Sequence, residues 1–337
     1  MTTRQTGALF DITGFVKIEV SGKGALALLQ KICTNNIDVK VGKVVYTVIS
    51  NIYGGIKSDL TVSRLEEDKF WILAGAGNGM IDLSWFKENA PKDGSVNIID
   101  WTSAYAGVGL WGPNSRKVLE SLCEDDDVTN EAFPFFSIKN ISISHIPCIA
   151  VRISYIGELG WEIYTPTEYG LTLWDELKNK SQDFNMICSG AGAFESLRLE
   201  KGYRSLGADI HTNSNPYEAG LGFTVKLKKE INFIGKDALA QLKQEPFKKK
   251  LCCMVMEDKE GMALGKEPIY DKNSKPVGYV TSTNYGYYVD KHILYGYLPY
   301  THSEEGTKLE IGYFDKRFPV VVMKEPLLDP ENKRLKS

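Results

Sequence analysis

The sequence predicts an α+β protein whose sheets are mostly antiparallel and whose last part is a small β-barrel. In the first half, strand-like and helix-like segments follow one another in the order strand–helix–strand–strand–helix–strand. From Leu251 onward, short strand-like segments recur at regular spacing, with Gly and Pro between them. The first pattern is typical of layered α+β domains rather than of a doubly wound parallel sheet, and the second is typical of a barrel.

The first half is arranged around residues 51–64. There, Tyr-Gly-Gly separates an apolar, β-branched run from a strictly alternating one, which predicts a hairpin because glycine reaches the positive φ angles of tight turns. On the second strand the packing residues share one face with Ser58, whereas Asp59 lies on the opposite face. Asp is depleted in strands. The presence of Asp59 has two interpretations. Either this face of the strand is exposed to solvent, or it lines a cavity in which Asp59 accepts a proton or binds a ligand.

The other elements follow from the spacing of apolar residues, since a period of two predicts strands and a period near 3.6 predicts helices. Helices are expected over residues 25–32, 80–89, 114–123, 168–179, 191–203 and 236–239. Strands are expected over residues 8–21, 69–74, 96–100, 105–113, 137–143, 148–154, 251–256, 277–282, 293–298, 308–311 and 318–323. The glycine cluster at 75–79 lacks the lysine of a phosphate-binding loop, which favours a turn where the backbone closely approaches a neighbour.

Composition argues against several classes of protein. The 337 residues suggest two or three packing units, and 43% hydrophobic with 25% charged residues describe an ordinary soluble globular protein. A net charge of −3, without a dense Lys/Arg stretch, argues against nucleic-acid binding. The six cysteines are scattered without CxxC spacing, which suggests reduced thiols, and neither a signal-peptide core nor a membrane-length apolar run is present. We therefore expect a cytoplasmic protein, or a mitochondrial matrix protein in a eukaryote. The scattered cysteines and histidines predict no metal site.

Residues 155–164 hold an unusual density of functional side chains. Two acidic residues, two tyrosines and a tryptophan lie within ten residues, and Glu162 and Tyr164 share one face of a short strand. Aromatic walls with one carboxylate suit a flat heterocycle that forms hydrogen bonds. The stretch therefore indicates either a packed aromatic hairpin or the pocket for such a ring.

Taken together, these segments resemble a known family along nearly the whole chain. Residues 54–62 resemble the GG-x-x-D-D-hydrophobic segment of the aminomethyltransferases of glycine cleavage, and three further segments match the same superfamily: residues 155–164, 196–202 and 216–221. Other stretches are similar to the C-terminal folate domains of dimethylglycine and sarcosine dehydrogenases or oxidases: residues 58–62, 110–113, 130–135 and 157–164. The resemblance is specific because several motifs match in the same order.

The resemblance implies a three-domain, clover-like aminomethyltransferase fold with tetrahydrofolate in a central channel. Residues 1–245 would form the folate-binding region, and residues 246–337 would form a C-terminal β-barrel domain. The folate-binding region would divide into two interleaved α+β subdomains, approximately residues 1–50 with 137–245, and residues 51–136. The implied function is capture of a methylene unit from an iminium derived from an N-methyl amine, which gives 5,10-methylene-tetrahydrofolate.

The resemblance also implies roles for individual residues. Asp59 would lie beside the folate N10, where it helps to deprotonate or orient the attacking amine. Glu162 would accept hydrogen bonds from the pterin edge, and Tyr155 and Tyr164 would wall the ring. The other implied folate contacts are Tyr46, Thr61 and the backbone near Leu73 and Ile163.

The sequence departs from the family pattern at several points. Ser58 replaces the first aspartate of the glycine-cleavage pair, which fits the dehydrogenase-linked branch, and Phe194 stands where the glycine-cleavage enzymes carry an arginine. A GxGxxG motif after an N-terminal strand is absent. The resemblance therefore implies either a folate half that acts with a separate FAD-containing oxidase or dehydrogenase, or a stand-alone transferase for a methylamine-type substrate.

Two other functions within the superfamily stay open. One is an O-, S- or N-demethylase that gives 5-methyl-tetrahydrofolate. The other is a folate-binding module without turnover; such relatives carry a K-G-C-Y-x-G-Q-E signature, whereas this chain reads Lys-Gly-Tyr-Arg at residues 201–204.

Overall fold

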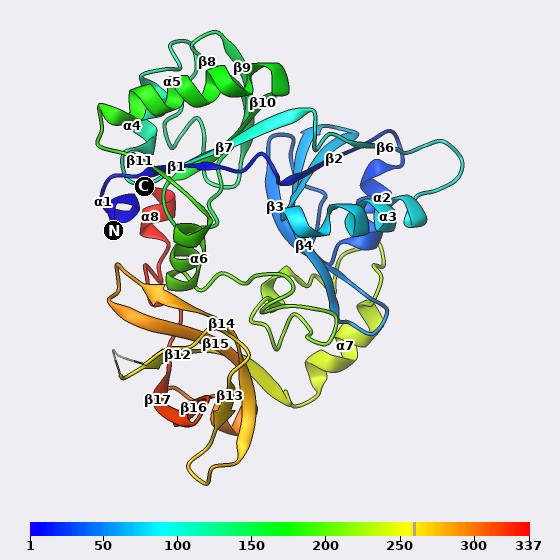
Figure 1. Cartoon of the computed structure of the whole chain (residues 1–337). Coiled ribbons are helices and arrows are strands. Elements are labelled where there is room, and N and C mark those ends of the chain that lie inside the picture. Colours follow the sequence, from blue (N-terminus) through cyan, green and yellow to red (C-terminus); the bar gives the residue numbers. More distant parts are fainter. Residues whose placement is uncertain (259–260) are drawn as a thin grey trace.

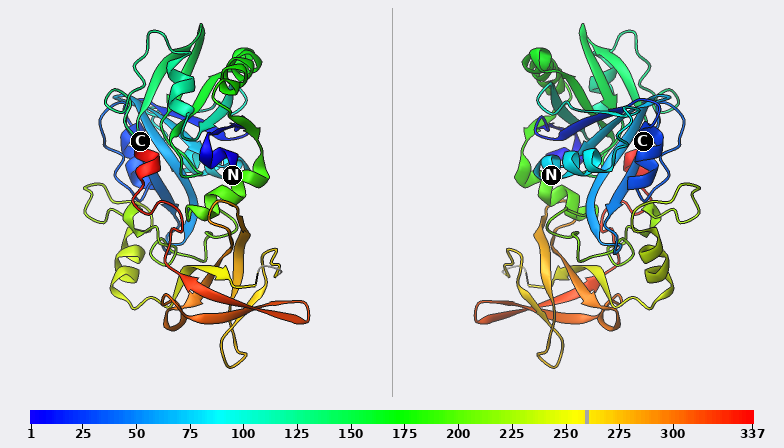
Figure 2. Two further views of the ribbon diagram at one scale, coloured as in Figure 1. Left: turned by 90° about the vertical axis from the view of Figure 1, so that its left-hand side faces the viewer. Right: turned by 90° about the vertical axis from the view of Figure 1, so that its right-hand side faces the viewer.

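The computed structural model describes residues 1–258 and 261–337. Within these residues, the strands form two open sheets and one closed barrel (Figure 1). The side views of Figure 2 show the barrel at one end of the molecule, below the two sheets. The α+β class with antiparallel sheets and a C-terminal barrel is therefore confirmed.

The first sheet has the strand order β3-β4-β5-β2-β6, and every pair in it is antiparallel. Its strands are β2 (Val16–Ser21), β3 (Val44–Ser50), β4 (Ile56–Glu66), β5 (Lys69–Ala74) and β6 (Asn97–Asp100). One face packs on helices α2 (Ala25–Ile32) and α3 (Gly79–Asn89). Gly54, at φ +83°, makes the predicted hairpin turn between β3 and β4.

The second sheet has the order β11-β1-β7-β10-β9-β8. Its strands are β1 (Ala8–Asp11), β7 (Tyr105–Trp111), β8 (Ile138–Ile143), β9 (Ile146–Val151), β10 (Gly160–Pro166) and β11 (Ile187–Ser189). Helices α4 (Ser115–Glu120) and α5 (Gly170–Gln182) contribute to the core on one face. Trp71 and Leu73 of β5 join Trp111 and Tyr164 in a core between the two sheets.

The barrel closes in the order β12-β15-β14-β13-β16-β17. Its strands are β12 (Lys249–Met256), β13 (Pro268–Tyr270), β14 (Pro276–Gly286), β15 (Lys291–Pro299), β16 (Lys308–Tyr313) and β17 (Lys316–Met323). Helix α6 (Ala191–Glu200) packs against β14 and β15, and α7 (Lys236–Gln244) precedes the barrel. After β17 the chain returns to the N-terminal helix α1 (Thr2–Gln5) and ends in α8 (Lys333–Lys336) (Figure 1).

The structure adds to or changes several of the expected elements. The single strand expected over residues 8–21 is two strands in different sheets, because the Asp11 carboxylate accepts the Thr13 N–H (2.9 Å) and turns the chain. The strands between residues 16 and 100 form one sheet, and the expected subdomain division near residues 50 and 136 stays a prediction. The three-residue strands β11 and β13 were not expected, because each is too short to show an apolar alternation.

Candidate functional site

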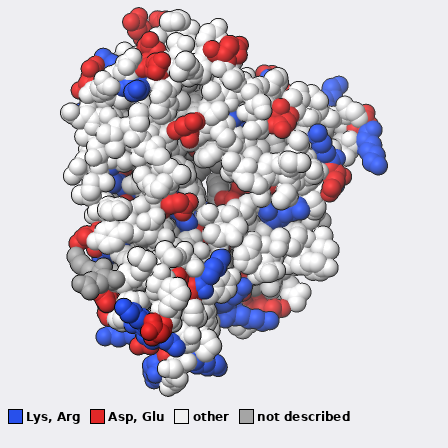
Figure 3. Space-filling view, in the orientation of Figure 1, with Lys and Arg blue, Asp and Glu red and all other residues white. Residues whose placement is uncertain are grey.

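A cavity of about 970 Å³ lies where the two sheets, α6 and the segment after the barrel meet. The face drawn in Figure 3 is hollowed near its centre, and Lys and Arg are interspersed with Asp and Glu across it. Most of the ligand-contacting residues that the sequence suggested line this cavity: Tyr46, Asp59, Thr61, Leu73, Tyr155 and Glu162. The structure therefore brings together side chains that are more than a hundred residues apart.

Asp59 lies in the middle of β4 and faces the cavity with the polar side of that strand. The neighbouring β3 carries Tyr46, whose Oη donates a hydrogen bond to Asp59 Oδ2 at 2.8 Å. Burial raises the pKa of Asp59 to about 6, and the hydrogen bond from Tyr46 opposes part of that rise. Burial and the Asp59 charge raise the pKa of Tyr46 well above its usual value, so Tyr46 stays a donor. A carboxyl group with a pKa of about 6 is mostly ionised at neutral pH and can accept a proton from a ligand.

Glu162 forms a second acidic position on the cavity wall. It is 4% exposed on β10, and the Tyr164 Oη donates a hydrogen bond to its Oε2 at 2.7 Å. Burial raises the pKa of Glu162 to about 7, while the Tyr164 bond and the Lys17 charge lower it. Lys17 Nζ is itself held by the carbonyl oxygens of Thr13 (2.7 Å) and Phe15 (2.8 Å). A ligand that offers N–H donors would stabilise the ionised form of Glu162.

Tyr164 and Ile163 lie behind the wall rather than on it. Both side chains are fully buried, and Ile163 belongs to the core of the second sheet. The Tyr164 ring packs edge-on against Trp71 at 5.2 Å, so it does not wall the cavity as the resemblance implied. The reason is that the cavity reaches only as far as Glu162 along β10. Tyr164 instead orients the Glu162 carboxyl group.

Tyr155 supplies the aromatic side of the cavity. Its ring stacks with Phe194 at 5.2 Å and with Tyr203 at 6.0 Å, and all three side chains line the cavity. The Tyr155 Oη donates a hydrogen bond to the Arg204 carbonyl oxygen at 2.6 Å, which fixes the ring plane. Phe194, which replaces the arginine of the family pattern, therefore belongs to an aromatic stack.

Several residues of the cavity wall were not predicted from the sequence: Arg204, Phe223 and Glu325. Arg204 pairs with Glu325 through two contacts of 2.7 and 3.0 Å, and both residues line the cavity. Phe223 stacks on Tyr46 at 6.2 Å and is 62% exposed at the rim. Arg204 could have been predicted as a site residue, because it directly follows Lys201-Gly202-Tyr203. The residues around position 325 carry no local motif that indicates a contact with this wall.

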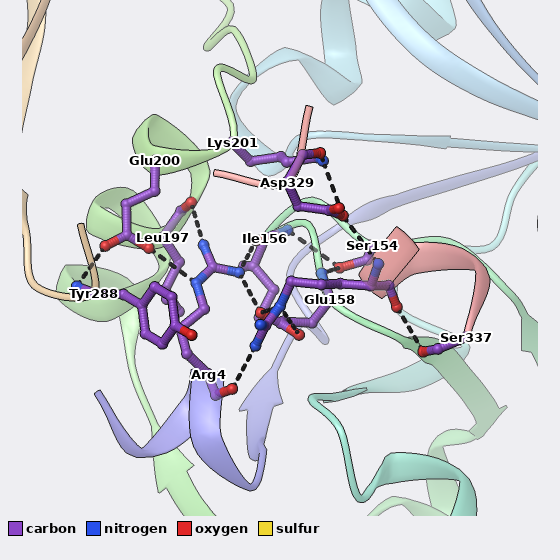
Figure 4. A network of polar contacts seen from close by, with 11 residues as sticks. Arg4, Ser154, Ile156, Glu158, Leu197, Glu200, Lys201, Tyr288, Asp329 and Ser337 are labelled. Carbon is purple, nitrogen blue, oxygen red and sulfur yellow. Dashed lines mark hydrogen bonds and ion pairs between the residues drawn. The ribbon is translucent and has the colours of Figure 1, made fainter. Parts of the chain in front are cut away.

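A buried network of charges holds the chain ends against α6 (Figure 4). Arg4 is 1% exposed and pairs with Glu158 and with Glu200, both at 2.9 Å. Arg334 from α8 reaches the same Glu158 at 2.8 Å. Lys201, on the cavity wall, pairs with Asp329 at 3.4 Å. The network therefore fixes the segment after the barrel, which closes one side of the cavity.

Among residues 1–258 and 261–337, no three His, Cys, Asp or Glu side chains gather as they would to hold a metal ion. In the same part of the chain, every helix is too short or too polar to cross a membrane.

Two family models cover most of the chain. Residues 1–229 match the GCVT N-terminal domain, and residues 249–329 match the glycine cleavage T-protein C-terminal barrel domain. The chain belongs to the glycine cleavage T-protein family. The resemblance drawn from the motifs is confirmed.

Individual relatives agree with this membership. Human mitochondrial dimethylglycine dehydrogenase is 36% identical over 339 residues, which cover 99% of this chain but 38% of that protein. An aminomethyltransferase of Halothermothrix orenii is 34% identical and covers 96% of this chain and 89% of that protein. The crystal structure of aminomethyltransferase T from Bartonella henselae superposes with a TM-score of 0.86 at 26% identity, over 97% of this chain and 88% of that chain. This T-protein family member therefore spans about two fifths of the dehydrogenase relatives it matches.

Aminomethyltransferases of this family bind tetrahydrofolate, and the cavity suits that ligand. Glu162 offers a buried carboxyl group to a ring edge with N–H donors, and its burial leaves that group in need of such a partner. The stack of Tyr155 and Phe194 offers a flat apolar surface. The cavity volume lies within the range of pre-formed sites for molecules of this size.

Proposed function

We propose that the chain captures a methylene unit from an iminium derived from an N-methyl amine and transfers it to tetrahydrofolate, which gives 5,10-methylene-tetrahydrofolate. The observation that carries the proposal is the Asp59 carboxyl group on the cavity wall, hydrogen-bonded to Tyr46 and with its pKa raised to about 6. Such a group is ionised at neutral pH yet basic enough to accept a proton.

Tetrahydrofolate, when bound, supplies the amine nitrogens that receive the carbon unit. Glu162 would hold the pterin edge through its carboxyl oxygens, and the Tyr155 ring would lie beside it. Tyr46, Thr61 and Leu73, which line the same cavity, would contact the remainder of the ligand. Tyr164 would act on the ligand through Glu162.

The residues of this chain would contribute to the transfer in two ways. Asp59 would accept the proton that the attacking nitrogen loses and return it to the donor nitrogen as the bond between the carbon unit and that nitrogen breaks, so that the demethylated amine leaves. Its negative charge would also stabilise the cationic donor beside it. The cavity walls would hold the reactants together, which favours transfer over hydrolysis of the iminium to formaldehyde. Such positioning contributes roughly 7–11 kcal/mol in the best-oriented systems.

The donor iminium has to come from an amine oxidation, and we propose that a separate FAD-containing oxidase or dehydrogenase supplies it. The similarity to dimethylglycine dehydrogenase, of which this chain covers 38%, supports a partner of that kind. A small N-methyl amine would then be the original substrate.

The test is a titration with tetrahydrofolate, followed by product analysis with formaldehyde and with candidate methylamines plus an amine oxidase. Wild type, Asp59→Asn and the exposed control Asp175→Asn are compared. We expect all three to bind tetrahydrofolate and only Asp59→Asn to lose turnover, by about 10²-fold or more. Formation of 5-methyl-tetrahydrofolate would indicate the demethylase instead. Binding without any product would indicate a folate-binding module, and absence of binding would refute the proposal.

A further inference from the structure

The barrel contributes no side chain to the cavity within the part of the chain that the structure describes. The described lining residues come from the two sheets and the loops next to them, from residues 194–223, and from residues 325–335. Strands β12 to β17 supply none of them. The barrel nevertheless packs against α6, mainly through β14. Any effect of the barrel on the cavity therefore has to pass through residues that lie behind the wall.

Asp209 contacts both the barrel and the segment that forms part of the wall. Its side chain is 1% exposed and does not line the cavity. On the barrel side, the Thr281 Oγ1 of β14 donates a hydrogen bond to Asp209 Oδ1 at 2.6 Å. The Tyr297 Oη of β15 donates a second one to the Asp209 carbonyl oxygen at 2.9 Å. The barrel therefore holds both the side chain and the backbone of Asp209.

On the cavity side, Asp209 and Arg198 hold the wall segment that follows α6. Asp209 Oδ2 accepts hydrogen bonds from the Ser205 N–H at 3.0 Å and from Arg198 Nη1 at 2.7 Å. The same Arg198 Nη1 donates to the Tyr203 carbonyl oxygen at 3.0 Å, and Arg198 Nη2 donates to the Ser282 Oγ of β14 at 2.8 Å. The wall segment is thus fixed at two points by one buried ion pair, and the barrel contacts both partners of that pair.

The wall segment in turn fixes the ring of Tyr155. The Tyr155 Oη donates a hydrogen bond to the Arg204 carbonyl oxygen at 2.6 Å, in the middle of that segment. Burial raises the pKa of Tyr155, so its hydroxyl group stays a donor. The ring also stacks on Tyr203 at 6.0 Å. A displacement of the wall segment would therefore move both the hydrogen-bond partner of Tyr155 and one of its stacking partners.

We propose that Asp209 is a positioning residue through which the C-terminal barrel sets the orientation of the Tyr155 ring and hence the affinity for tetrahydrofolate. The barrel then has a role in ligand binding, although none of its described residues lines the cavity. The inference rests on the proposed function in one respect, because that proposal places the ring of tetrahydrofolate beside Tyr155. Thr281 and Ser282 are the barrel residues that carry the effect.

The test uses variants that change this link without touching the cavity. Thr281→Val keeps the branched shape of the side chain and removes the hydrogen bond to Asp209. Thr281→Ser restores a hydroxyl group, and Ser282→Ala removes the second side-chain contact from β14. Thr283→Val is the matched control, because Thr283 lies on the same strand and its hydroxyl group pairs with His292 Nε2 at 3.0 Å instead.

Two quantities are measured for each variant of the whole chain. The first is the dissociation constant for tetrahydrofolate, by calorimetry. The second is the ¹³Cζ resonance of labelled tyrosine without ligand, and Tyr155→Phe assigns the Tyr155 signal. Thermal melting shows that each variant is folded at the temperature of the measurement.

We expect Thr281→Val to weaken tetrahydrofolate binding about three- to tenfold, since the hydrogen bond to a charged group is worth more than this and part of its effect reaches the wall. The Tyr155 resonance should shift in the same variant. Thr281→Ser should recover most of the affinity and the resonance of wild type. Ser282→Ala should have a smaller effect of the same kind, because Arg198 keeps its bond to Asp209. Thr283→Val should match wild type in both measurements.

The inference is refuted if Thr281→Val leaves either the affinity or the Tyr155 resonance unchanged, or if Thr283→Val weakens binding equally. A lower melting temperature of Thr281→Val without a shift of the Tyr155 resonance would assign this contact a purely structural role. If Thr281→Ser behaved like Thr281→Val, the hydroxyl group would not be the cause. Failure of the proposed function is recognised separately, as absence of tetrahydrofolate binding by wild type, and the Tyr155 resonance would then still test whether the barrel positions that ring.

Discussion

Replacing Tyr46 by phenylalanine tests whether the Tyr46 hydroxyl group keeps Asp59 ionised. The change removes the 2.8 Å hydrogen bond to Asp59 and keeps the ring, which stacks on Phe223 at 6.2 Å. The hydrogen bond favours the ionised carboxylate, so its loss should raise the pKa of Asp59 above the present value of about 6.

The size of the shift follows from the strength of the bond. A hydrogen bond to a charged acceptor is worth roughly 1.5–3 kcal/mol, and one pH unit corresponds to about 1.36 kcal/mol. The Asp59 midpoint should therefore move up by about one to two units. Because the carboxylate is the active form, the rate of one-carbon transfer rises with pH through the Asp59 pKa, and the acid limb should shift upward by the same amount.

The assay needs no knowledge of the donor. Carboxyl ¹³C resonances of labelled Asp are followed between about pH 4 and pH 9 in wild type, Tyr46→Phe and the partly exposed control Tyr169→Phe, and Asp59→Asn assigns the signal. We expect an upward shift in Tyr46→Phe alone. A midpoint that stays in place or falls would refute the reasoning, because it would show that burial by itself sets the Asp59 pKa.

Two further predictions concern stability. Arg4→Met removes the guanidinium group from two buried carboxylates and should lower the free energy of unfolding by roughly 3–5 kcal/mol in urea at neutral pH. The loss should shrink at lower pH, because burial raises the pKa of Glu158 and the group becomes protonated. A loss below about 1 kcal/mol would contradict a stabilising role for these ion pairs. Asp59→Asn should stabilise the fold by about 1–3 kcal/mol above pH 6. The pKa of Asp59 in the folded state, about 6, exceeds the usual 3.8, so the free energy of unfolding of wild type falls as pH rises between these values. If Asp59→Asn stabilised the fold equally below about pH 4, the gain would not come from the ionisation of Asp59.

The central hairpin and its polar face could be predicted because their signals are local. The alternation in β4 and the turn at Gly54 fix which side chains share a face, so the position of Asp59 and its neighbour Thr61 followed from spacing alone. Whether that face meets solvent or a cavity is decided by tertiary packing. The resemblance to folate enzymes resolved this ambiguity, and the structure places both side chains on the cavity wall.

Other parts of the site had no local signal. Glu325 reaches Arg204 only because the segment after the barrel returns across the molecule, a contact between residues 121 apart. Tyr164 shares a face with Glu162, but sequence could not show where along β10 the cavity ends.

Two acids of the cavity, Asp59 and Glu162, share one physical feature, which links the fold to the proposed chemistry. Burial raises the pKa of Asp59 to about 6 and that of Glu162 to about 7, and each accepts a hydrogen bond from a tyrosine. The fold thus bears the cost of dehydrating both groups before any ligand enters. A ligand that brings N–H donors to Glu162 and a cation to Asp59 would stabilise the ionised forms of both carboxyl groups. Binding of the folate and of the amine donor would then use separate walls of one cavity, which holds the reacting atoms between them.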